Sequence, residues 1–180
     1  MEWPTLDSFL EFTERFIRED PGSVLFVIID KTKPRQNSEI PGRIAGLIGW
    51  LHASTHTLSA EIGPVIILPE FQRTFVSSNA TGLLLKYLLD LPSDGGLGFR
   101  RIVWCANPFN QASIAAAKKL GFVEEGVMRW TWVLSAGKEG KPVDGRRKEG
   151  NGRDSTVLSI TWEDWEGGVR ETLQKRMDRV

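Results

Sequence analysis

The sequence lacks several features that would place a protein outside the soluble globular class. It contains one cysteine, which cannot form an internal disulfide. No apolar run approaches the ~20 residues that a membrane-spanning helix needs. The first residues, MEWPTLDSFLEF, have neither the basic start nor the apolar stretch of a secretory signal. We therefore expect a cytoplasmic protein with no membrane partner.

Net charge is also absent, because 23 Lys and Arg residues balance 23 Asp and Glu residues. Affinity for nucleic acid rests largely on neutralising phosphates, so we expect no nucleic-acid partner. What the sequence does have is 41% apolar residues in 180, which is enough to fill a single core. We expect residues 1–180 to form one domain.

Hydrophobic spacing predicts alternating helices and strands. Helical periodicity predicts helices over residues 5–18, 77–91 and 111–120. Apolar or alternating segments predict strands over residues 24–29, 44–51, 60–68, 100–106, 122–134 and 157–162. The strand at 24–29 reads VLFVII, which is typical of a strand covered on both faces. The order predicts an α/β fold: a mixed, mostly antiparallel central sheet with one parallel strand pair and flanking helices.

Two segments contribute little to this predicted core. Residues 135–155 are rich in glycine and charge and almost free of apolar side chains, so we expect a mobile loop. Residues 163–180 are expected to form a charged C-terminal tail.

The most informative segment runs from Glu61 to Ala80, where a strand leads through a tight turn into a helix. A helix N-terminus presents unpaired N–H groups at the positive end of the helix dipole. Such a turn can hold a pyrophosphate, although an ordinary strand-to-helix connection has the same pattern.

A second segment, after the strand at 100–106, favours the pyrophosphate-binding interpretation. It contains, in order, Asn110, Ser113, Lys119, Gly121, Phe122, Glu125, Gly126 and Arg129. This spacing resembles the GNAT superfamily of N-acetyltransferases, in the branch similar to RimJ and RimL. AEIG at 60–63 and PEFQ at 69–72 resemble the acetyl-CoA-binding strand and turn of that family.

The resemblance implies that acetyl-CoA, as co-substrate, lies where the strands at 60–68 and 100–106 splay apart. Pro64 has no N–H for a ladder, which predicts a local distortion of its strand. Backbone groups of Ile66 to Leu68 would pair with the pantetheine, and the turn would receive the pyrophosphate. The implied cofactor-binding residues are Ile66, Ile67, Leu68, Gln72, Arg73, Thr74, Phe75, Val76, Ser77, Ser78, Asn107, Asn110 and Ser113. For Asn110, a helix cap is the alternative to this contact.

The sequence departs from the family in two places. The usual phosphate turn of the family is Q/RxxGxG/A, and in this sequence Phe75 and Ser77 stand at its two glycine positions. A positive φ at Phe75 would be strained. The family also has a further strand and helix before the helix at 5–18. The N-terminal strand is therefore missing from this sequence, or something else covers that sheet edge.

Acetyl transfer to an amine needs a base, an oxyanion donor and an acid. The resemblance implies Glu61 as the base, with a surface strand glutamate as the alternative. It implies a backbone N–H near Ile67 or Leu68 as the oxyanion donor. The usual tyrosine position holds Ala117, and Tyr87 falls in the apolar register of its helix, so Ser113 is the proposed acid. Ser113 as a plain helix-surface hydroxyl is the alternative, and no metal is expected.

These expectations describe an acetyl-CoA-dependent N-acetyltransferase. Its acceptor would be a primary amine, on a protein N-terminus or a small molecule, attacking the thioester directly in a ternary complex. One alternative is a catalytically weak or inactive GNAT-like module that binds acyl-CoA or a protein partner. Another is a homodimer formed through the hairpin that carries Trp130 and Trp132.

Overall fold

The computed structural model describes residues 5–34, 41–135 and 137–179. The strands are β1 (Val24–Asp30), β2 (Arg43–Ser54), β3 (Ser59–Ile67), β4 (Arg101–Ala106), β5 (Val123–Val133) and β6 (Gly152–Thr161). The helices are α1 (Leu6–Thr13), α2 (Phe75–Leu89), α3 (Gln111–Lys119), α4 (Trp162–Asp164) and α5 (Arg170–Met177). Short π-helical or 3₁₀ segments are η1 (Glu14–Arg18), η2 (Pro69–Phe71), η3 (Pro92–Asp94) and η4 (Trp165–Val169).

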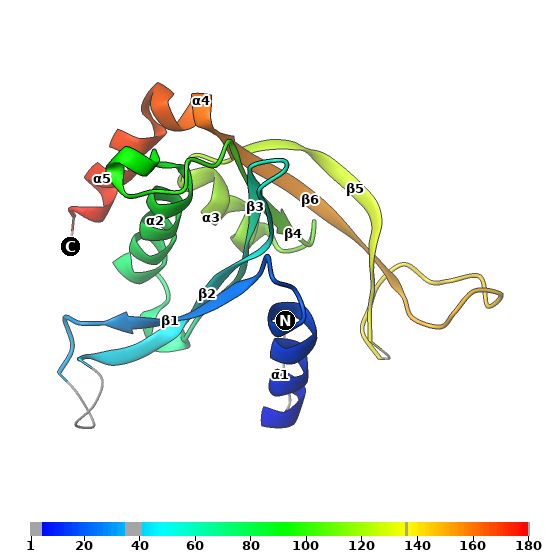
Figure 1. Cartoon of the computed structure of the whole chain (residues 1–180). Coiled ribbons are helices and arrows are strands. Elements are labelled where there is room, and N and C mark those ends of the chain that lie inside the picture. Colours follow the sequence, from blue (N-terminus) through cyan, green and yellow to red (C-terminus); the bar gives the residue numbers. More distant parts are fainter. Residues whose placement is uncertain (1–4, 35–40, 136, 180) are drawn as a thin grey trace. The chain divides into compact units, whose positions relative to one another are not determined.

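The strands form a six-stranded mixed sheet in the order β1-β2-β3-β4-β6-β5 (Figure 1). Its parallel pair is β3 with β4, and helices flank it, so the predicted α/β fold is confirmed. The chain divides into two compact units, residues 1–102 with 161–180 and residues 103–160, and each is described by itself.

In the first unit, β1, β2 and β3 form an antiparallel meander, with Phe26 opposite Ile48 and Leu47 opposite Ile66. Helix α2 follows and buries one face, including Leu85 and Leu88. The predicted helix at 77–91 is therefore present but begins at Phe75, because Thr74 caps it.

The end of the chain is part of this core and not only a charged tail. Trp165 is 2% exposed, and its indole Nε1 donates to Asp90 Oδ1 over 2.8 Å. Arg170 Nε lies 3.1 Å from the same oxygen. Two donors thus satisfy a buried carboxylate at the end of α2, which ties α5 and η4 to that helix.

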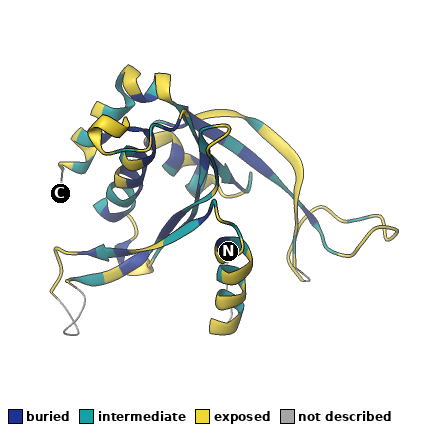
Figure 2. Ribbon diagram, in the orientation of Figure 1, coloured by how far each residue is buried: buried dark blue, intermediate teal, exposed yellow. Residues whose placement is uncertain are grey.

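The prediction that β1 is covered on both faces is wrong. Phe26 is 41% and Val27 53% exposed, and the middle of the strand is yellow in Figure 2. β1 ends the strand order, so within the described residues no strand pairs with its outer edge. A continuous apolar run alone cannot distinguish a central strand from the last strand of a sheet order.

The second unit contains α3 and the antiparallel hairpin of β5 and β6, with Val127 opposite Thr156. Its second strand begins at Gly152, earlier than the predicted 157, so residues 152–155 belong to the sheet and not to a loop. The first residue of β6 lies against the Trp130 ring. A Cβ on Gly152 would lie 2.1 Å from it, so only glycine allows the close approach.

Candidate functional site

The strand that should carry the cofactor is bulged where Pro64 predicts a distortion. Ile48 lies opposite Val65 and Trp50 opposite Ile62, so β3 has one more residue than β2 between these pairs. The Gly63–Pro64 peptide bond within the bulge is cis. The predicted local distortion is confirmed.

Backbone direction separates the three residues expected to face the pantetheine. The Leu68 N–H donates to Ala45 O over 2.9 Å, so Leu68 faces β2. Directions alternate along an antiparallel strand, so Ile66 also faces β2 and Ile67 faces away. A Cβ on Gly46 would lie 2.0 Å from Ile66 O, which agrees with this assignment. The expectation of free backbone groups at Ile66 and Leu68 is therefore corrected, and Ile67 alone of the three keeps its N–H directed away from β2.

The turn after β3 is held together by side chains. Gln72 Nε2 donates to Ile67 O over 3.0 Å, and the Thr74 hydroxyl donates to Phe71 O over 2.6 Å. Thr74 Oγ1 also accepts from the Val76 N–H at 3.3 Å and so caps α2. Gln72 and Thr74 thus shape the turn.

The strain expected at Phe75 falls on Arg73, whose φ is +61°. Phe75 is the first helical residue, and its side chain lines an apolar pocket between α2 and β1. The side chains at both family glycine positions therefore sit on a normal helix, because the left-handed residue comes before the cap.

The start of α2 offers donors for an anion. The first N–H groups of a helix, here those of Thr74 to Ser77, have no acceptor within the helix, and Thr74 satisfies only that of Val76. The Ser78 hydroxyl donates to Phe75 O over 2.9 Å, so Ser78 serves the helix itself. Exposed Arg73 adds a positive charge beside this helix end.

The proposed base, Glu61, lies on β3 opposite Leu51 and is half-buried. Its neighbours Ala60 and Ile62 are buried on the other face of the strand. Glu61 is therefore on the sheet face that carries the less buried residues of β3.

In the second unit, Asn107 and Asn110 organise the turn between β4 and α3. Asn107 Oδ1 accepts from the Phe109 N–H at 3.0 Å, and Asn110 Oδ1 accepts from the Ser113 N–H at 3.1 Å. Asn110 thus has the helix-cap role that was its alternative. Its amide nitrogen remains the group to consider for a ligand.

Sequence reasoning missed Trp104, whose indole Nε1 donates to Ser113 Oγ over 3.0 Å. Trp104 is buried, and its ring meets Phe122 edge-on with centroids 5.5 Å apart. Alternation along RIVWCA places Trp104 on the buried face of β4, but the sequence holds no signal for its contact with α3.

Tyr87, expected in the core, is 46% exposed.

Two further features concern metal ligands and membrane helices within residues 5–34, 41–135 and 137–179. No three His, Cys, Asp or Glu side chains there come together as metal ligands. No helix in those ranges is long and apolar enough to cross a bilayer.

Comparison with known proteins decides the family. The GNAT acetyltransferase domain model matches residues 1–123, more than half of the chain. The chain belongs to the GNAT acetyltransferase family. No sequence among the curated proteins matches this GNAT chain.

Solved structures agree with the GNAT fold. A GCN5-related N-acetyltransferase from Brucella melitensis is 22% identical with a TM-score of 0.72, covering 97% of this chain and 66% of its own. A GNAT-family acetyltransferase structure from Chromobacterium violaceum ATCC 12472 is 26% identical with a TM-score of 0.68, covering 92% and 69%. A spermidine N-acetyltransferase SpeG variant from Vibrio cholerae is 19% identical with a TM-score of 0.61, covering 91% and 79%. The family supports acyl transfer in general.

Proposed function

We propose that this GNAT chain transfers an acetyl group from acetyl-CoA to a primary amine, on a protein N-terminus or a small molecule, by direct attack in a ternary complex. The observation that carries the proposal is the start of α2. There the left-handed Arg73 and the Thr74 cap leave N–H groups of the first turn, such as that of Ser77, beside a positive charge.

The residues of this turn fit a pyrophosphate without the family glycines. The Phe75 side chain lies in the α2–β1 pocket, and Ser77 is small. Neither Phe75 nor Ser77 has the positive backbone φ that a glycine would allow. The diphosphate would accept hydrogen bonds from the helix N–H groups, as anions do at other helix starts.

The acceptor amine must lose a proton before or during attack, because an alkylammonium with a pKa near ~10 has no lone pair. Glu61 is assigned this role, directly or through a water molecule. The Ile67 N–H, directed away from β2, is assigned to the oxyanion that develops on the thioester carbonyl. The backbone carbonyl of Ile67 accepts a hydrogen bond from the Gln72 side chain, which holds this part of the backbone in place.

The CoA thiolate then needs a proton. Ser113 is assigned as its donor, because Trp104 occupies an acceptor position of the hydroxyl and leaves its hydrogen available. The amide nitrogen of Asn110 is assigned to the pantetheine arm, since its oxygen caps α3.

A second reading, a catalytically weak module that binds acyl-CoA or a protein, is favoured by Ala117. This residue stands at the usual tyrosine position and is 0% exposed, so a phenol has no room there. The GNAT fold would then retain the cofactor turn but lack an efficient acid.

Two measurements on the purified chain separate the readings. Acetyl-CoA should raise the melting temperature, and above the Kd this rise should grow with the logarithm of the ligand concentration. Thiol release from acetyl-CoA should then require an amine from a panel of peptide N-termini, alkylamines and spermidine. Stabilisation without thiol release supports the module reading, and no stabilisation at millimolar acetyl-CoA contradicts the proposed cofactor site.

A further inference from the structure

A histidine and a carboxylate form a pair beside the proposed base. His52 Nδ1 lies 2.8 Å from Asp20 Oδ2. The same Asp20 oxygen accepts from the Ser23 hydroxyl over 2.6 Å, and Ser23 Oγ accepts from the His52 N–H at 3.1 Å. These bonds hold the imidazole with its Nδ1 on the carboxylate. Nε2 is therefore the nitrogen that can exchange a proton with a third group.

The backbone of His52 is in an unusual conformation. Its φ is +53°, which costs free energy in a residue other than glycine, although histidine adopts this region more readily than most residues do. Just beyond the pair of Leu51 with Glu61, β2 has one residue more than β3 before the two strands pair again. This β-bulge re-aims the His52 side chain out of the normal alternation of the strand. Strain of this kind is common at functional sites.

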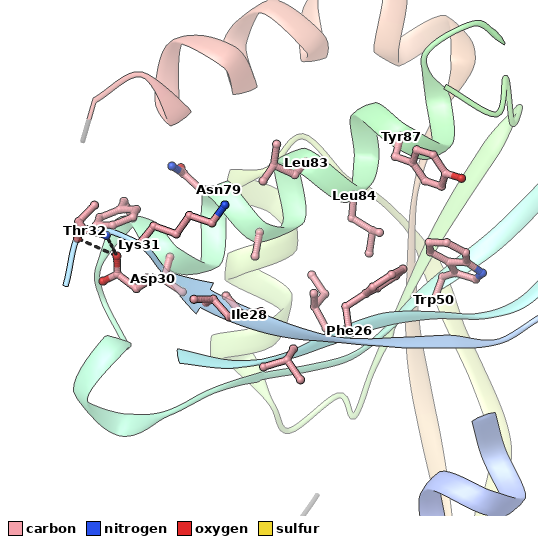
Figure 3. A pocket seen from close by; sticks show the side chains of 16 residues that line it. Phe26, Ile28, Asp30, Lys31, Thr32, Trp50, Asn79, Leu83, Leu84 and Tyr87 are labelled. Atoms are coloured by element: carbon pink, nitrogen blue, oxygen red, sulfur yellow. Dashed lines mark hydrogen bonds between the residues drawn. The ribbon is translucent and has the colours of Figure 1, made fainter. Parts of the chain in front are cut away.

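The pair lies on the face of the sheet that carries Glu61. Trp50 points from β2 toward α2, where it stacks on an aromatic ring of that helix (Figure 3). Leu51 follows Trp50 and faces the other way, together with Glu61 opposite it. Helix α1, which leads through η1 to Asp20, lies on this other side of β1 and β2 (Figure 1). Asp20 therefore draws the His52 ring to the face of Glu61.

His52 thus stands between two carboxylates on neighbouring elements. Asp20 is in the turn before β1, and Glu61 is on β3 across from the residue next to His52. Side chains on adjacent strands at such positions are near enough for one water molecule to bridge them. Other charged side chains of β1, β2 and η1 include Asp30 and Arg43 at the far strand ends, and Arg18 paired with Glu14 over 2.9 Å.

We propose that His52 carries the acceptor's proton from Glu61 to the medium, with Asp20 as the residue that positions the ring; this role rests on the proposed acetyl transfer. Glu61 takes a proton from the acceptor ammonium and becomes a neutral carboxylic acid. That acid passes the proton through a water molecule to Nε2, which restores the Glu61 carboxylate and forms an imidazolium beside Asp20. The imidazolium then loses the Nε2 proton to solvent, so both groups return to their starting states.

Nitrogen NMR of the imidazole rings tests this geometry without turnover. The chain has two histidines, so His56→Gln assigns both signals. At alkaline pH, neutral His52 should carry its hydrogen on Nδ1 and leave Nε2 unprotonated, because Asp20 accepts from Nδ1. Asp20→Ala should remove this preference. A neutral His52 with its hydrogen on Nε2 overturns the relay.

Thiol release from acetyl-CoA with a saturating amine acceptor tests the proton transfer itself. His52→Gly removes the ring and accepts the φ of +53° without strain. It should lower kcat about tenfold, less than the loss expected for the base itself, and imidazole added to the buffer should restore most of this loss. His52→Asn also tolerates a positive φ but has no titratable nitrogen, and should show the same loss. His56→Gly, on the hairpin turn after β2, is the matched control and should keep wild-type kcat with or without imidazole.

These results separate the relay from the proposed function. If the wild type releases no thiol with any amine, both are overturned. If the wild type turns over and His52→Gly and His52→Asn have the same kcat as wild type, the relay alone is overturned. A loss in His52→Gly that added imidazole does not restore also overturns the relay, because a merely structural role of His52 predicts that result.

Discussion

The indole Nε1 of Trp104 donates a 3.0 Å hydrogen bond to the hydroxyl oxygen of Ser113. An indole is a donor only, so Ser113 must accept, and its own hydrogen points to another acceptor. A buried tryptophan on β4 thereby orients a hydroxyl on α3 as a donor. Trp104 is a positioning residue for the proposed acid.

Ser113→Ala is expected to lower kcat by about 10²-fold with little change in the KM for acetyl-CoA, because only proton transfer is lost. Trp104→Phe keeps the aromatic packing but removes the donor, and should lower kcat in the same direction by less. Steady-state kinetics with one amine acceptor measure both. If Trp104→Phe lowers stability by about 1 kcal/mol while neither variant changes kcat, Ser113 is a surface hydroxyl.

Glu61→Gln should lower kcat/KM by about 10²-fold or more and remove the acidic limb of its pH profile, since the amide cannot accept the proton. Acetyl-CoA should still raise the melting temperature of this variant. Glu163→Gln, an exposed glutamate in α4, is the matched control and should behave as wild type. An unchanged pH profile in Glu61→Gln would assign the base to another group.

Arg73→Gly should change stability and binding in opposite directions. Glycine accepts the φ of +61° freely, so the free energy of unfolding should rise by up to about 1 kcal/mol. Loss of the charge beside the helix start should weaken acetyl-CoA binding several-fold, and this loss should shrink at high salt. Arg73→Lys keeps the charge and the strain and serves as control. Equal affinity in all three proteins would show that Arg73 does not face the phosphates.

Asp20 is expected to make stability depend on pH in the acidic range. Its carboxylate accepts from the Ser23 hydroxyl and the Gly22 N–H and contacts His52 Nδ1, and these bonds, that of Ser23 first, lower its pKa. A lowered pKa in the folded state stabilises the fold above the unfolded pKa near ~3.9, and the gain is lost as pH falls through the folded value.

Asp20→Ala should therefore lower the free energy of unfolding at pH 7 by about 1–3 kcal/mol. This variant should unfold at a lower urea concentration than the wild type. The two proteins should converge as the pH falls from the unfolded pKa through the lower pKa that Asp20 has in the folded state. Denaturation series at several pH values measure the difference. A gap that stays constant down to the lowest pH would assign the effect to lost packing and not to the charge.

Much of the fold could be predicted from local patterns. Apolar spacing placed α1 with η1, α2 and α3 close to their observed bounds, and the single proline in β3 indicated the bulge. The spaced motif from Asn110 to Arg129 by itself indicated the GNAT family. These features are local, because helix periodicity, capping and the missing proline N–H act within a few residues.

Tertiary structure alone decided which of those residues are available. The Leu68 N–H is taken by Ala45, and Ser113 is held by Trp104. Among the described strands β1 ends the sheet order, although Val24 to Ile29 is a continuous apolar run. Each of these facts depends on a partner in another helix or strand, or on the lack of one among the described strands. A linear pattern specifies how apolar a strand is, whereas hydrogen-bond direction and edge exposure are properties of the assembled sheet.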